Sequence, residues 1–193
     1  MSLGELREAA IIAAIVDRVS AADRFCGETL LQKSAFFLKE LFGIALSPKF
    51  RLYHYGPFSF DLRDQLRSME ADDVVRIRPH EFGATYVVGD RYAMLQRQFP
   101  KTLAEYAKQI DFVVRELSPK GVKDLEALAT ALYVAKTSPR ASVDVRAKEL
   151  HTIKPHVDME RARASVAKVD EWIAAEGSAS LGSRSSGRDE VAG

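Results

Sequence analysis

Residues 28–78 decide the fold, and they read ETLLQKSAFFLKELFGIALSPKFRLYHYGPFSFDLRDQLRSMEADDVVRIR. When each residue is placed at about 100° from the last, most apolar side chains between 28 and 42 fall on one broad arc. That pattern predicts a helix that is buried over more than half of its girth. Gly43 follows, where a glycine commonly ends a helix.

The rest of this stretch predicts a turn, a second helix and a hairpin. Alternating side chains from Pro48 onward favour an extended segment, which turns at Gly56-Pro57. Ser59 is suited to cap a helix that reaches Glu70. Residues 74–88 then alternate about Gly83, which predicts a β-hairpin.

Two helices followed by a hairpin are typical of a winged-helix module. In that layout residues 58–70 would be the recognition helix and the hairpin would be the wing. We therefore expect a mainly α protein with a small β-hairpin, whose winged-helix-like N-terminal module spans residues 1–98.

The remainder of the chain has helical spacing. The expected helices cover residues 3–22, 101–117, 122–136, 143–151 and a final stretch from Asp158. Residues 99–176 are thus expected to form a helical extension packed on the first module. Residues 177–193 are rich in Ser and Gly and poor in large apolar residues, which predicts a disordered tail.

Composition limits the function classes. The 193 residues are 47% hydrophobic and 28% charged, with a net charge of +1, so no overall field attracts nucleic acid or an anionic membrane. The single cysteine, Cys26, excludes an internal disulfide and fits a cytoplasmic location. No apolar stretch is long enough to span a bilayer, and no secretory signal is found, so no membrane partner is expected.

No residue pattern predicts chemistry. The histidines, at positions 54, 80, 151 and 156, have no metal-binding spacing, and phosphate-loop and dinucleotide fingerprints are missing from the sequence. We therefore predict no catalytic residue, no metal and no cofactor, and expect a protein that is not an enzyme.

Two aromatic features are candidates for binding. Phe36 falls within the polar arc of the 28–42 helix, beside Lys33, where it is either covered by another element or exposed as a docking residue. The rings of the Tyr-His-Tyr turn either pack on the helix near Leu31 or line a pocket for a ligand or partner. The predicted partner- or ligand-binding residues are Lys33, Phe36, Tyr53, His54, Tyr55, Gly56 and Pro57.

The charge of the expected recognition helix counts against DNA binding. Between Ser59 and Asp73, two arginines face five carboxylates, a net charge of −3, whereas phosphate contacts need cations. The wing is more basic. The possible nucleic-acid-binding residues are Arg51, Arg63, Arg67, Arg76 and Arg78.

Leu31-Gln32-Lys33, followed by the turn at 53–59 and by Asp61-Leu62, resembles the YwgA-like proteins of bacteria and archaea. Residues 125–155 resemble them too. The Leu-Gln-Lys helix and the Tyr-Gly-Pro step are more distantly similar to the Panacea domain, the SocA-like antitoxin and phage-associated family. The resemblance implies a small helical regulatory or antitoxin-like protein, and it brings no enzymatic residues.

Three functions remain open, in this order. The first is a non-enzymatic regulatory or interaction protein that binds another protein. The second is a winged-helix transcriptional regulator that binds DNA. The third is a small-molecule or enzymatic site around His54, and self-association is compatible with each.

Overall fold

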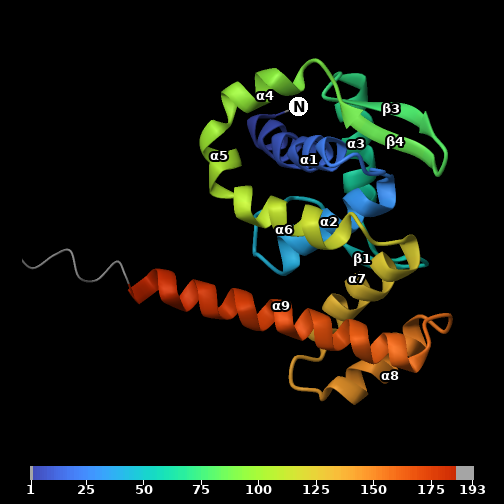
Figure 1. The fold of residues 1–193 in the computed structure, drawn as a ribbon. Helices are drawn as coiled ribbons and strands as arrows, with labels where there is room; N and C mark the ends of the chain where they lie inside the picture. The colour runs from blue at the N-terminus through green and yellow to red at the C-terminus, as the bar shows by residue number, and fades with distance from the viewer. Residues whose placement is uncertain (1, 186–193) are drawn as a thin grey trace, which may run out of the picture. The chain divides into compact units, whose positions relative to one another are not determined.

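The computed structural model describes residues 2–185, and it is mainly helical, with 65% helix. Within that range the chain forms nine helices and two short antiparallel hairpins (Figure 1). This confirms the predicted class of a mainly α protein with a small hairpin. The chain divides into two compact units, Met1–Ala129 and Thr130–Gly193.

Helix α1 (Leu3–Ala21) forms the centre of the first unit. Ser2 caps it in a capping box, since its hydroxyl accepts from the Glu5 N–H while the Glu5 side chain accepts from the Ser2 N–H. The apolar side chains from Ala9 to Val16 are almost fully buried. They are covered because α4 (Tyr92–Gln98), α5 (Pro100–Glu105) and α6 (Ala107–Leu117) run around α1 (Figure 1).

Helix α2 (Glu28–Glu40) is followed by a hairpin that the sequence did not predict. Strands β1 (Arg51–Tyr53) and β2 (Gly56–Phe58) pair antiparallel, with Tyr53 opposite Gly56. The expected single extended segment therefore folds back on itself through a two-residue loop. Helix α3 (Phe60–Ala71) follows at once.

The predicted β-hairpin is present as β3 (Val75–His80) and β4 (Gly83–Val88). The loop between α1 and α2 lies along β4, because the Tyr86 N–H donates to the Cys26 carbonyl over 2.8 Å. The Cys26 N–H in turn donates to the Thr85 hydroxyl over 3.1 Å. These two hydrogen bonds hold Cys26, which lies just before α2, against the β3–β4 hairpin.

The second unit holds the end of α7 (Val122–Thr137) together with α8 (Val143–Ile153) and α9 (Met159–Ser185). Helices α8 and α9 pack on each other. The Arg146 guanidinium donates two hydrogen bonds of 2.6 Å to the Asp170 carboxylate, which joins the two helices.

The unit boundary falls after residue 129, whereas the sequence suggested a division after residue 98. The two divisions differ because α6 packs on α1 and α2, which places residues 100–117 in the first unit.

The tail also differs from the prediction. Helix α9 continues to Ser185, so residues 177–185 are helical, and residues 186–193 lie outside the described part. Extending a formed helix adds a hydrogen bond for each residue ordered, and therefore needs no apolar side chain at every turn.

Across residues 2–185, none of the helices combines the length and the apolar character that a bilayer crossing requires.

Burial of Cys26 leads to a prediction about thiol reactivity. The Cys26 side chain is fully buried, and desolvation raises the pKa of its thiol to about 12. Because the thiolate is the reactive form, we expect the folded protein to react very slowly with an aromatic disulfide reagent at about pH 8. The same chain unfolded in urea should react at the rate of a free thiol. Rapid labelling of the folded protein would contradict this burial.

Candidate functional site

The side chains of Gln32 and Lys33 hold the backbone on either side of the Gly-Pro turn. The Gln32 amide donates to the Ser59 carbonyl over 2.9 Å and accepts from the Ser59 N–H over 3.0 Å. The Lys33 ammonium donates to the Pro57 carbonyl over 2.9 Å. Both side chains are only 1% exposed.

Lys33 is therefore unable to contact a partner directly, and its prediction as a binding residue is corrected. On a helical wheel it lies with polar residues, but the returning chain covers that side of α2. Its role is to position β2. The Gln32 amide likewise fixes where α3 begins, because the Ser59 hydroxyl caps this helix by accepting from the Leu62 N–H.

Phe36 is also buried, at 3% exposure. Its ring meets Phe50 edge-on with centroids 5.3 Å apart, and Phe37 at 6.3 Å. The alternative in which another element covers Phe36 is thus confirmed, and the docking alternative is wrong. The covering loop is held by side chains, since Glu8 accepts two hydrogen bonds from Ser47 and Lys39 donates to the Leu46 and Pro48 carbonyls.

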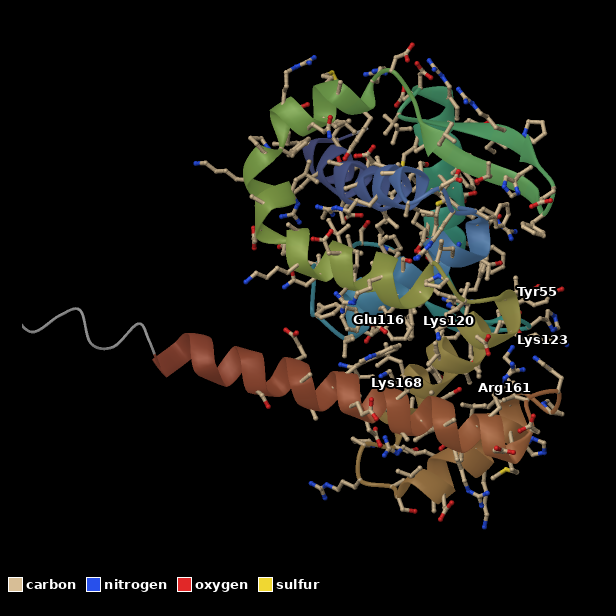
Figure 2. The ribbon with its side chains drawn as sticks, in the orientation of Figure 1. Tyr55, Glu116, Lys120, Lys123, Arg161 and Lys168 are labelled. Carbon is tan, nitrogen blue, oxygen red and sulfur yellow. The ribbon has the colours of Figure 1, made fainter. Side chains whose placement is uncertain are left out.

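The residues of the Tyr-His-Tyr turn lie at the surface. Tyr53 is 48% and Tyr55 63% exposed, and His54 is exposed too. His54 and Tyr55 form the loop of the β1–β2 hairpin, and Figure 2 shows Tyr55 there. Gly56 has φ +83°, a left-handed conformation that glycine adopts without steric cost. Gly56 and Pro57 are buried and act as the anchored base of this tip.

A further aromatic residue, Phe60, completes an exposed group of rings. It is 51% exposed at the first position of α3. Its centroid lies 5.6 Å from that of Tyr53, which in turn lies 4.6 Å from His54. We call Tyr53, His54, Tyr55 and Phe60 the aromatic surface. Sequence reasoning missed Phe60, although its place directly after the cap residue Ser59, opposite the buried Leu62, was a usable signal.

Arg63 borders the aromatic surface. Its guanidinium carbon lies 4.6 Å from the ring centroid of the buried Phe58, within the range of a cation–π contact. Its Nε also donates to the Glu28 carboxylate over 2.9 Å. The ion pair with Glu28 balances the arginine's charge, and the cation–π contact fixes its guanidinium beside the rings.

The other predicted arginines differ in how far acids neutralise them. Arg76 is clamped by Asp73 at 2.6 Å and by Asp90 at 2.7 Å, and this guanidinium lowers the pKa of the Asp73 carboxyl. Arg67 pairs with Asp64 at 3.4 Å. Arg51 and Arg78 are exposed and have no ion pair within the described residues.

The first unit contains cavities at two places that bear on the site. One of about 250 Å³ lies beside Ser47 and Asp61, and one of about 620 Å³ lies at the start of α2. Tyr53, His54 and Tyr55 line neither of these two cavities. Among residues 2–185, no group of three or more His, Cys, Asp or Glu side chains could hold a metal ion.

Comparison with known proteins adds no assignment. No protein-family model matches the chain, and no curated protein sequence matches it significantly. The similarity to YwgA-like and Panacea proteins therefore stays a prediction from the residues quoted above.

The buried Gln32 amide can be tested by mutation. Gln32→Ala leaves the buried Ser59 N–H without a partner and leaves the Ser59 carbonyl with only the Arg63 N–H, at 3.2 Å, so we expect it to lower the free energy of unfolding by about 2 kcal/mol. The exposed Gln98→Ala is the matched control, expected to change it by less than about 0.5 kcal/mol. Urea titrations of both variants measure the difference. Equal stabilities would show that the amide contributes little.

Proposed function

We propose that this chain is a non-enzymatic protein-binding module that recognises a partner protein through the aromatic surface. The observation that supports this most directly is the exposure of Tyr53, Tyr55 and Phe60, three rings gathered on one hairpin tip and the adjoining helix start. Such rings are enriched in protein interfaces and often supply most of the binding energy.

The architecture beneath the rings favours binding. An aromatic side chain can bury about 150–250 Å² of surface, so these rings offer a large apolar area. The β1–β2 hairpin that carries two of them is anchored through buried hydrogen bonds from Lys33 and Gln32. A surface that is ordered before binding loses less conformational entropy on binding, which raises affinity.

The resemblance described above agrees with this proposal. A regulatory or antitoxin-like protein acts by holding another protein, and it needs no catalytic residues. The hydrogen bonds from Gln32 and Lys33 to the backbone of Ser59 and Pro57 also give a physical reason for the Leu-Gln-Lys helix and the Tyr-Gly-Pro turn to occur together, since the helix positions the turn. We propose a cytoplasmic location on the same basis.

The experiment is affinity capture from the native extract with a matched set of variants. Wild type is compared with the double variant Tyr55→Ser/Phe60→Ser and with the control Leu3→Ser/Val145→Ser. The control residues are similarly exposed, at 67% and 53%, but lie outside the aromatic surface. We expect a stoichiometric partner that wild type and the control retain and that the double variant loses.

Quantitative mass spectrometry reads the captured proteins, and thermal melts check that each variant is folded. If every protein captured by wild type is captured equally by the double variant, the aromatic surface does not bind a partner and the proposal is refuted.

A second candidate function is DNA binding by a winged helix. The order of the elements favours this function. Winged-helix modules have a short strand after the first helix, and here the loop at Cys26, which follows α1, pairs with β4 in that place. Helices α2 and α3 and the β3–β4 hairpin then follow, as the module requires. Of the five arginines predicted to contact nucleic acid, Arg78 on β3 and Arg51 on β1 are the exposed ones that have no ion pair among the described residues. The acidic α3 counts against this function.

A salt series of duplex binding by fluorescence anisotropy separates the two functions. DNA binding by these cations predicts affinity that falls steeply with salt, and a slope of log Kd against log salt reduced by about two in Arg51→Ala/Arg78→Ala. Arg97→Ala, an exposed arginine on α4, is the control and should bind like wild type. The protein-binding proposal predicts no measurable duplex binding even at low salt.

A further inference from the structure

The larger of the two cavities described above is lined by none of the Tyr-His-Tyr residues. Its volume is about 620 Å³, and it opens between the start of α2, the tip of the β3–β4 hairpin and the turn that joins α6 to α7. All of its lining residues belong to the first unit. A cavity of this size falls within the range of about 300–1,000 Å³ that small-molecule sites occupy.

Aromatic rings form one wall of this cavity. Phe25 and Phe82 meet edge-on with their centroids 6.1 Å apart, and His80 lies 5.1 Å from Phe25. Phe82 is 71% exposed, so most of its ring has no protein contact. Gly27 lets the Phe25 ring lie close to the backbone, since a Cβ at that position would lie 2.7 Å from the ring in its present place.

The opposite wall is aliphatic. Leu30 and Leu125 are buried at its base, and Val122 is 52% exposed at its mouth. The charged side chains that line the cavity are those of Glu28 and Lys120, the latter on the exposed turn after α6 (Figure 2). The Glu28 carboxylate already accepts a hydrogen bond from Arg63.

We propose that this cavity binds an uncharged, ring-bearing apolar small molecule. The rings of Phe25 and Phe82 provide edge and face contacts for a ligand ring, and Leu30, Val122 and Leu125 provide apolar contacts for the remainder. Binding there would bury the exposed part of Phe82, which is the largest apolar area of this wall. This activity is separate from the proposed protein binding, which uses other residues.

Titration with N-phenyl-1-naphthylamine, a neutral dye with two ring systems that fluoresces in apolar surroundings, tests the proposal. We expect saturable binding of one dye per chain. Phe82→Ser removes a phenyl contact and should weaken binding about tenfold or more. Val122→Ser should weaken it severalfold, whereas Val145→Ser, with a similarly exposed valine at 53%, should bind like wild type.

Amide NMR spectra locate the dye independently of the variants. The N–H signals of Thr29, Ala84 and Gly121, which surround the cavity, should shift on titration, and those of α8 should not. Absence of saturable binding, equal affinity in all variants, or shifts centred elsewhere would each overturn the proposal. Because Phe82 and Val122 are exposed, both variants should fold, and circular dichroism checks this.

Discussion

One amide side chain sets the geometry on which the surface of the first unit depends. The Gln32 side chain makes hydrogen bonds to both the N–H and the carbonyl of Ser59, which lies 27 residues further along the chain, and both bonds are buried. Because donor and acceptor satisfy each other, neither group is left without a hydrogen bond inside the protein. That pairing fixes the end of β2 and the first turn of α3, and through them the Tyr-His-Tyr tip and Phe60.

The same device recurs in the long connection from α2 to α3. The backbone groups of residues 44–50 make few hydrogen bonds to other backbone groups. Side chains provide further hydrogen bonds, from Glu8 on α1 and from Lys39 on α2. Buried backbone groups require hydrogen bonds, so charged side chains inside this unit replace the ladder that a sheet would provide. The connection can then lie over Phe36 without regular structure.

Most of the helices and the β3–β4 hairpin could be predicted from the sequence because their apolar residues repeat with a clear period. The short helix α4 was not among the expected helices, and the break between α5 and α6 was not predicted. Gln32 and Lys33 could not be placed correctly, and Phe36 was left with two alternatives, because a helical wheel treats a polar side as exposed and contains no information about a chain that returns over it. The β1–β2 hairpin was missed because strands of three residues have too few alternations to show a period. The sequence drew attention to the Tyr-His-Tyr turn, whereas its neighbour Phe60 and the cavity near Phe82 depend on contacts distant in sequence.

The contact between Cys26 and Tyr86 has a consequence for how chains can associate. The Cys26 loop takes up a backbone hydrogen bond on the outer side of β4. Within residues 2–185, β3 is therefore the edge of the hairpin that no other strand pairs with. This edge carries Arg76 and Arg78, and Pro79 offers no N–H to an incoming strand. Charge and proline on an edge oppose sheet extension and aggregation. Any stable neighbour of this hairpin must therefore be held by side chains rather than by continuing the sheet.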